Sequence, residues 1–180
     1  MANTREIVTK AVVGKGKKTF TTTKTVTPEC QPTTILGCWV INHTFGGSRS
    51  GNKINIEGSY DVNIWYSCSD DTKTEVVRET TNYLEEVNVP KQDDSDVTNE
   101  DIIIRSLKQP SCTRADIVNG KIEYTIQKEL GIEIVGDVKV KIAYDEEEDP
   151  WEVIMDDDSN EDIQNAEEQI DQEVNEEYLD

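Results

Sequence analysis

The chain has 180 residues, of which 34% are hydrophobic, and a formal net charge of -20. It contains no run of about 20 apolar residues, the length that a membrane-spanning helix needs, so we expect no membrane insertion. Residues 145–180 contain eighteen Asp or Glu and no Lys or Arg, whereas the remainder contains twenty acidic and eighteen basic residues. This asymmetry predicts a nearly neutral body, residues 1–145, followed by a polyanionic tail, residues 146–180.

The N-terminal residues 1–28 are locally basic, with six Lys or Arg against one Glu. They contain no apolar signal-peptide core, so we expect synthesis in the cytosol. The run Gly14–Lys18 lacks the spacing of a phosphate-binding loop, and we interpret it as a basic hairpin turn. Nucleic acid is not an expected partner, because the acidic tail would repel it more strongly than these residues attract it.

The next segments favour β-structure. Residues 19–27 are rich in threonine, and the apolar run 33–45 ends near a predicted break at Gly46–Ser48. His43 shares the parity of Trp39, Ile41 and Phe45, which is typical of a hydrogen-bonded core histidine. With a single histidine and no nucleophile-elbow serine, a catalytic triad has no basis.

Strict alternation of apolar and polar residues dominates two segments, 54–68 and 122–144. It predicts strands that bury one face, with Lys128 as the one charged residue on the apolar side. Further breaks are expected at Ser69–Asp71, at Asn119–Gly120 and between Lys91 and Asn99. A long strand is expected at residues 72–89. The fold class is therefore all-β, with an antiparallel β-sandwich-like body.

A shift of 78 residues superimposes Ile54–Gly58 on Ile132–Gly136 and Gln31-Pro32 on Gln109-Pro110. One interpretation is a duplicated β-unit, with pseudo-repeats at about 1–90 and 91–145. The other is that any two alternating strands match at their apolar positions. Glycine within a strand, at Gly58 and Gly136, is the more informative coincidence.

The tail has two interpretations: a solvated, disordered segment, or a partly helical one that folds against a basic partner. Apolar residues recur within it at helical spacing beyond Ser159. We take the following as candidate partner-binding residues, the apolar ones for selectivity and the acidic ones for attraction: Trp151, Ile154, Asp156, Asp157, Asp158, Ile163, Ile170 and Val174.

Four scattered cysteines show no Cys-x-x-Cys pair, which argues against a zinc site, and no metal, cofactor or catalytic residue is predicted. We expect the thiols to be reduced when the protein is made. Cys30 and Cys112, each next to a proline-containing loop, are the candidates for later cross-linking between chains. Cys38 and Cys68 lie in strand patterns.

Several runs resemble the CotE family of outer spore coat morphogenetic proteins. They span most of residues 5–140 in order, and the most specific is the third: Arg5–Lys17, Ile35–His43, Ile56–Ser67 with Thr72–Val77, Gln109–Cys112 and Val135–Val140. The resemblance implies a protein made in the mother-cell cytoplasm during sporulation that assembles into the outer spore coat. It implies a homo-oligomeric scaffold that recruits other spore coat proteins, without catalysis or cofactor.

Two alternatives to the scaffold stay open. One is a stand-alone β-sandwich module that binds cell-wall glycan through exposed aromatic residues such as Trp65. The other is a hydrolase whose acidic pair is not evident from the sequence. A scaffold should form large multimers, whereas a binding module should be a monomer of about 20 kDa.

Overall fold

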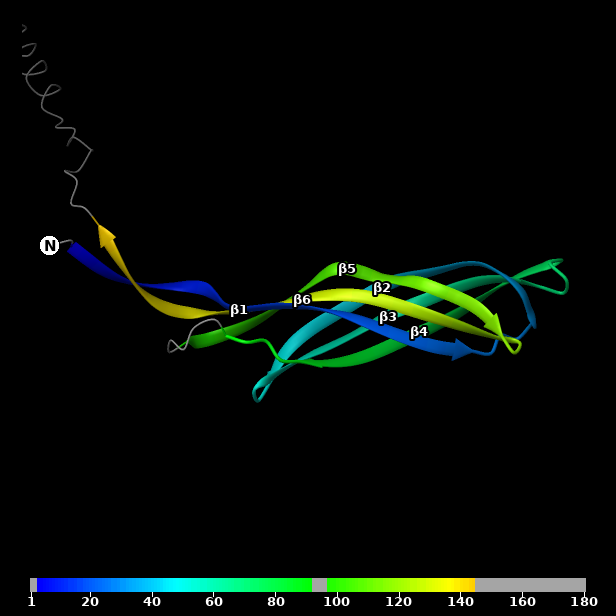
Figure 1. Cartoon of the computed structure of the whole chain (residues 1–180), viewed down its shortest axis with the longest axis horizontal. Helices are drawn as coiled ribbons and strands as arrows, with labels where there is room; N and C mark the ends of the chain where they lie inside the picture. The colour runs from blue at the N-terminus through cyan, green and yellow to red at the C-terminus, as the bar shows by residue number, and fades with distance from the viewer. Residues whose placement is uncertain (1–2, 92–96, 145–180) are drawn as a thin grey trace, which may run out of the picture. The chain divides into compact units, whose positions relative to one another are not determined.

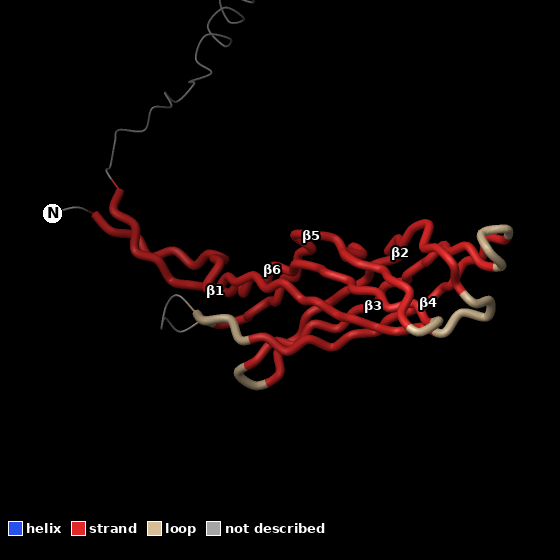
Figure 2. The backbone as a smooth tube through the Cα atoms, turned by 45° about the vertical axis from the view of Figure 1, so that its right-hand side comes forward, coloured by secondary structure: helices blue, strands red, loops and turns tan. Residues whose placement is uncertain are grey.

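A computed structural model describes residues 3–91 and 97–144 of the chain. The described residues form strands joined by turns and short loops, with no helix among them, which confirms the all-β prediction (Figures 1 and 2). The strands are β1 (Asn3–Val26), β2 (Pro32–Ser50), β3 (Lys53–Cys68), β4 (Lys73–Val87), β5 (Thr98–Val118) and β6 (Lys121–Tyr144). No helix in these residues is long and apolar enough to cross a membrane.

The strands build two antiparallel three-stranded sheets with the orders β1-β6-β5 and β2-β3-β4. The long alternating segments thus become the central strands, β6 and β3. Two units are distinguished in the chain, the larger being Glu6–Lys141. In the described part of the smaller unit, the Arg5 guanidinium lies 4.8 Å from the centroid of the Tyr144 ring.

The core forms between the sheets of the larger unit. Ile54 and Ile56, at the start of β3, share one cluster with Leu130, Ile132 and Ile134, late in β6. A second cluster joins the later part of β3 to the start of β6, and its buried residues are Tyr60, Val62, Ile64, Tyr66, Cys68, Ile122, Tyr124 and Ile126. The two central strands therefore pack face to face in opposite directions. Each fully buried aliphatic side chain contributes about 1.5–3 kcal/mol to stability.

Two of the predicted turns are confirmed. Asn119 and Gly120 both have positive φ and connect Val118 to Lys121 in a two-residue hairpin, as Asn-Gly favours. Ser69, Asp70 and Asp71 also have positive φ and lie in the turn between β3 and β4.

Two other predicted turns are wrong, because the glycines serve close packing instead. Gly46–Ser48 lies inside β2, and a Cβ at Gly47 would be 2.6 Å from Ile104 Cγ1, so glycine there lets β2 approach β5. The chain reverses after Ser50 instead, at Gly51. Likewise Gly14–Lys18 lies within the continuous strand β1, where Gly14 forms an isolated bridge with Lys91.

The duplicated β-unit stays a prediction, and the two sheets share one further feature. Gly58 and Gly136 lie in the two central strands: Gly136 is opposite a register shift in β5, and Gly58 is two residues from Tyr60, which is opposite a register shift in β2. Each shifted segment contains an asparagine with positive φ, Asn42 or Asn99, that donates a hydrogen bond of 2.8 Å to an aspartate of the central strand. The sheets do not separate at residue 90, because β1 belongs with β5 and β6.

Candidate functional site

A polar cluster lies between the two sheets, around His43 of β2. Its Nδ1 is 3.3 Å from Gln109 Oε1, and its Nε2 is 2.8 Å from the Tyr83 hydroxyl. Because the amide oxygen only accepts, Nδ1 carries the proton and Nε2 accepts from Tyr83. Burial lowers the pKa of His43, and the nearby Lys128 charge lowers it further, while the hydrogen bond to Gln109 opposes both effects. His43 is hydrogen-bonded, as predicted, but it is half-buried rather than a fully buried core residue.

Lys128 of β6 carries a buried positive charge beside this histidine, with 2% of its side chain exposed. Its Nζ lies 3.1 Å from Glu85 Oε1 and 3.9 Å from the centroid of the Tyr83 ring. A carboxylate and an aromatic face compensate the desolvation of the ammonium group. Glu85 and Tyr83 belong to β4, so this charge ties one sheet to the other. In the part of the chain that the structure describes, no serine or cysteine is hydrogen-bonded to His43.

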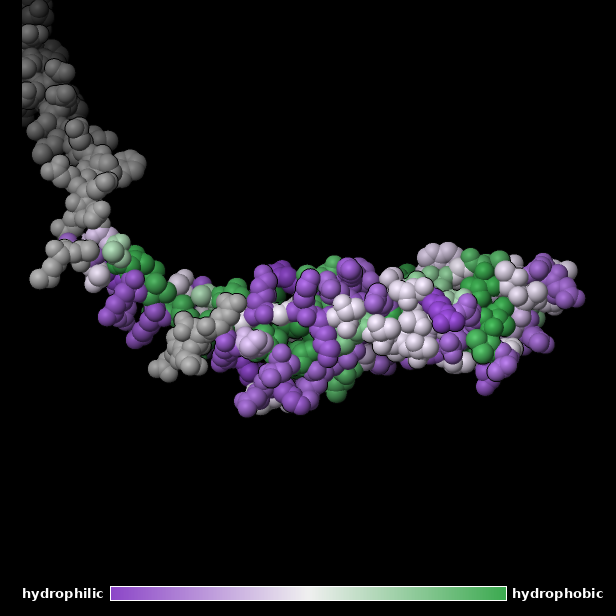
Figure 3. Space-filling model, in the orientation of Figure 1, coloured by the Kyte–Doolittle hydropathy of each residue, from purple (hydrophilic) through white to green (hydrophobic). Residues whose placement is uncertain are grey.

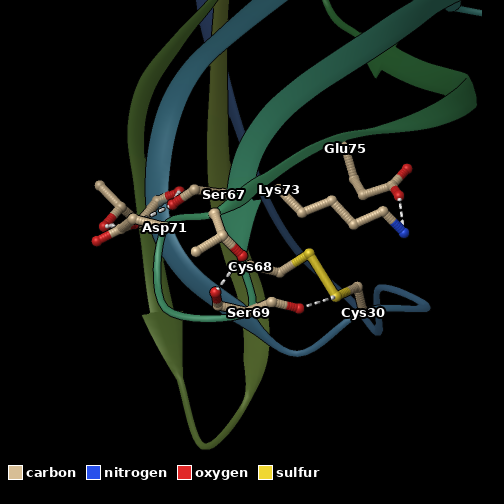
Figure 4. Close-up of a disulfide and its surroundings, with 9 residues drawn as sticks. Cys30, Ser67, Cys68, Ser69, Asp71, Lys73 and Glu75 are labelled. Carbon is tan, nitrogen blue, oxygen red and sulfur yellow. Dashed lines mark hydrogen bonds and ion pairs between the residues drawn. A yellow bond between two sulfur atoms is a disulfide. The ribbon is translucent and has the colours of Figure 1, made fainter.

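A disulfide joins Cys30 to Cys68, with a Cα–Cα distance of 6.1 Å (Figure 4). The expectation of reduced thiols concerned the protein as it is made; in the folded chain Cys30 is bonded to Cys68. Cys68 ends β3 and is paired in register with Pro32, so the segment before β2 passes close to it. Sequence spacing does not show that register, because the two cysteines are 38 residues apart.

Hydrogen bonds hold the turn next to the disulfide in place. Asp71 accepts from the hydroxyl groups of Ser67 and Thr34, the latter at 2.9 Å, and these bonds lower the pKa of its carboxyl group. Thr72 Oγ1 donates to the Ser69 carbonyl at 2.6 Å, and Ser69 Oγ lies 3.9 Å from Cys30 Sγ. The disulfide therefore closes an ordered corner of the sandwich rather than a loose loop.

Cys38 and Cys112 are free and half-buried. Cys38 of β2 pairs with Ile64, and Cys112 of β5 pairs with Ile126, so the two thiols come from different sheets. Burial raises the pKa of the Cys38 thiol, and a hydrogen bond with Cys112 raises it further. Of the two cysteines predicted to cross-link chains, Cys30 is thus bonded within the chain and Cys112 faces another thiol of the same chain.

The outer face of the β2-β3-β4 sheet exposes two tryptophans side by side. Trp65 is paired in register with Gly37, and the Trp39 ring covers the place of a Gly37 Cβ. Trp39 is 53% exposed and Trp65 41%. We call this surface the tryptophan face, and register places on it Gly37, Trp39, Ile41, Asp61, Asn63, Trp65, Val76, Arg78 and Thr80.

The sequence pattern placed Trp39 wrongly, on the same side as His43. A register shift between Ile41 and Thr44, where Asn42 adopts φ 56°, reverses the parity of β2. Trp39 and Ile41 consequently face outward while His43 faces the core. Such bulges reorient side chains without a clear sequence signal other than the asparagine, which tolerates positive φ.

Polar groups flank the exposed aromatic rings. Asp61 accepts hydrogen bonds from Asn42 at 2.8 Å and from Thr80 at 2.7 Å. These bonds, led by the one from Asn42, lower the pKa of the Asp61 carboxyl group. Asp61, Asn63 and Arg78 line a shallow depression beside Ile41. The tryptophan face thus combines apolar area with fixed polar groups.

Apolar side chains reach the surface elsewhere too (Figure 3). Those more than a third exposed, apart from Trp39, Ile41 and Trp65, are Val8, Val12, Leu36, Leu84, Leu107, Val118, Val140 and Ile142. Two lysines of the basic N-terminal segment form ion pairs within the protein, Lys10 with Asp101 at 3.1 Å and Lys15 with Glu133 at 3.4 Å. The segment is therefore less available to acidic partners than its composition indicates.

The candidate partner-binding residues of the tail lie outside the described residues. The whole chain was also compared with known proteins. It matches the family described as outer spore coat protein E (CotE) over residues 3–179. Neither the curated proteins nor the solved structures contain a match to it.

Proposed function

The chain belongs to the CotE family of outer spore coat proteins, and from this premise we propose that it is a scaffold of the coat. In this role it assembles with copies of itself, recruits other coat proteins and catalyses no reaction. Synthesis in the mother-cell cytoplasm precedes its incorporation into the coat. The family supports the coat location, and the arrangement of residues in this chain supports the mode of assembly.

The tryptophan face is the observation that carries the proposal of self-assembly. Large aromatic residues at roughly half exposure are typical of the centre of protein–protein contacts, where they supply much of the binding energy. Trp39, Ile41 and Trp65 are 53%, 45% and 41% exposed on one sheet face. Burial of each against a second copy removes apolar area from water, at about 25 cal/mol per Å².

Strand edges offer a second contribution to assembly. In the sheet order β2-β3-β4, β4 has a strand partner on one side only, within the described residues. Its outer edge can pair with another copy through backbone hydrogen bonds. Leu84 in this strand is 63% exposed, so apolar contact would accompany such pairing.

Light scattering coupled to size-exclusion chromatography tests the proposal on the full chain. A scaffold elutes at a mass that is a multiple of 20.3 kDa. The double variant Trp39→Ser/Trp65→Ser should shift the mass toward one chain, whereas the control Val8→Ser, an apolar residue of β1 that is 66% exposed, should not. Circular dichroism establishes that each variant is folded. A wild-type chain that stays monomeric at high concentration overturns the proposal.

The adjacency of Trp39 and Trp65 also favours a second candidate function, binding of cell-wall glycan. Two exposed indole rings with Asp61, Asn63 and Arg78 beside them present both stacking surfaces and hydrogen-bonding groups. This function requires a monomer that sediments with purified peptidoglycan, with sedimentation lost in Trp39→Ser/Trp65→Ser. A multimer that does not sediment with peptidoglycan would exclude the glycan-binding function.

A further inference from the structure

Strands β2 and β5 belong to different sheets yet contact each other along their lengths. At one end the Arg49 guanidinium forms an ion pair with Glu100. Further along, His43 Nδ1 bonds to Gln109 Oε1. Residue numbers thus fall along β2 as they rise along β5, so the two strands run antiparallel side by side.

Cys38 and Cys112 occupy the next position in this series. Cys38 lies eleven residues before Arg49 in β2, and Cys112 lies twelve residues after Glu100 in β5, so the two steps are nearly equal in length. Both residues pack against the same core cluster, the one formed by Tyr60–Cys68 and Ile122–Ile126. The two cysteines therefore lie across the boundary between the sheets, and the influence of Cys112 on the pKa of the Cys38 thiol agrees with this placement.

Each thiol lies next to an irregularity in its strand. Register shifts occur between Ile35 and Gly37, directly before Cys38, and between Cys112 and Arg114. The Cys112 thiol donates to the Arg114 carbonyl at 3.2 Å across its own bulge. Both side chains are half-buried rather than sealed in the core, so a small oxidant can reach them.

We propose that Cys38 and Cys112 form a second disulfide, one that links β2 to β5 when the protein meets a peroxide. The Cys112 thiolate attacks one peroxide oxygen and gives a sulfenic acid and one water. The Cys38 sulfur then loses its proton and attacks the sulfenic sulfur, and the hydroxyl leaves as a second water. Overall two thiols lose two electrons and two protons, and one peroxide becomes two waters.

This bond changes what the cysteines offer to neighbouring chains. The chain has four cysteines, and Cys30 and Cys68 are already joined. Once Cys38 and Cys112 are also joined, no thiol is left for a cross-link between chains. Oxidation of the pair therefore consumes the peroxide within one chain. The resulting disulfide fixes β2 against β5 and keeps Cys112 from bonding to another copy.

To test the proposal, the folded full chain is oxidised with hydrogen peroxide and then denatured. The remaining thiols are alkylated without reductant. Peptide mass spectrometry follows digestion with trypsin and chymotrypsin. Both enzymes are needed, because Cys30 and Cys38 share the tryptic segment 25–49, whereas chymotrypsin separates them after Leu36. We expect a Cys38–Cys112 linked peptide and at least a tenfold loss of alkylation at both residues.

Single variants provide the matched controls. In Cys38→Ser the Cys112 sulfenic acid has no internal partner, so peroxide should produce disulfide-linked dimers on non-reducing gels; Cys112→Ser should leave Cys38 alkylatable. In the wild type such dimers should be several-fold rarer. Alkylation of Cys38 and Cys112 that persists after oxidation, or dimers equally abundant in wild type and Cys38→Ser, would overturn the proposal.

Discussion

The Lys128 ammonium lies 3.9 Å from the centre of the Tyr83 ring, between the two sheets of the body. The same nitrogen is paired with Glu85, so the cation contacts both an aromatic face and a carboxylate of β4. The face of an aromatic ring is electron-rich and attracts a cation, most strongly where water is excluded. This contact fixes the orientation of Tyr83 and hence of its hydrogen bond to His43.

We predict that Glu85→Ala destabilises the body more than Lys128→Met. The first change leaves a cation that is 2% exposed without its carboxylate partner, which costs about 3–5 kcal/mol. The second removes the buried charge and leaves Glu85, whose side chain is 24% exposed, in reach of water. Urea unfolding of both variants measures the difference. Equal losses would mean that the pair contributes through packing alone.

Removal of the Cys30–Cys68 disulfide should lower the free energy of unfolding by about 2–4 kcal/mol. The bond closes a loop between residues 38 positions apart, which restricts the unfolded chain. Cys30→Ser and wild type in reductant should show similar losses in urea titrations. Cys38→Ser in the absence of oxidant should stay within about 1 kcal/mol of wild type, since it removes no covalent bond. A Cys30→Ser variant as stable as wild type would contradict the prediction.

The single histidine makes the stability of the body depend on pH just below 6.5, a range above that in which the carboxyl groups titrate. The folded pKa of His43 lies below its ordinary value of 6.5, because burial disfavours the imidazolium. Its contribution to stability is therefore fully present above pH 6.5 and is lost as pH falls toward the folded pKa. The slope is at most about 1.4 kcal/mol per pH unit for one proton.

Urea titrations at pH 7.5, 6.5 and 5.5 check this dependence, and His43→Gln is the control. Glutamine keeps a hydrogen-bonding side chain but does not titrate, so the slope between pH 6.5 and 5.5 should flatten. Hydrogen bonds also lower the pKa values of the Asp61 and Asp71 carboxyl groups. Their contribution to the stability of the fold is lost only as the pH falls to about 3.8 and below. A slope unchanged in His43→Gln would assign the effect to other groups.

Alternation along β3 and β6 was enough to predict the fold class, because one-face burial repeats every two residues. The Asn119–Gly120 hairpin was predictable from its dipeptide alone. The positions of Gly47 and Trp39 were not predictable: Gly47 admits Ile104 from the other sheet, and a bulge at Asn42 turns Trp39 outward. Both depend on contacts between segments far apart in sequence.

The same limit applies to the cysteines. Cys30 lies close to Cys68 because Pro32 pairs with Cys68. Cys38 and Cys112 come near each other because β2 runs beside β5. Neither register is encoded near the cysteines themselves. The absence of a Cys-x-x-Cys pair could argue against a metal site, but it carried no information on which thiols meet.

The body should fold without its acidic tail. The strands lie within residues 3–144, and the eighteen acidic residues of 145–180 would repel one another if packed together. A truncation that ends at Asp145 should keep a cooperative thermal transition and a β-type circular dichroism spectrum. The full chain is the reference for both measurements. Loss of the transition on truncation would show that the tail is part of the fold.

The tail should attract basic coat proteins by charge and select among them by its apolar residues. The eighteen acidic residues of 145–180 act over a Debye length of about 8 Å at physiological salt, which speeds encounter without discriminating partners. Ile163 and Ile170 can add selectivity, because burial of one such side chain contributes about 1.5–3 kcal/mol. Charge and apolar contact should therefore appear in different rate constants.

Two sets of substitutions separate these contributions in surface-binding kinetics with outer-coat proteins purified from spores. Changing Asp156, Asp157 and Asp158 to asparagine should slow association and flatten its dependence on salt, because electrostatic steering is lost. Changing Ile163 and Ile170 to serine should speed dissociation of some coat proteins by about tenfold or more, since each lost anchor of 1.4 kcal/mol is a factor of ten. Other coat proteins, held by charge alone, should dissociate as before. A uniform loss across all coat proteins in both sets would reduce the tail to a source of charge.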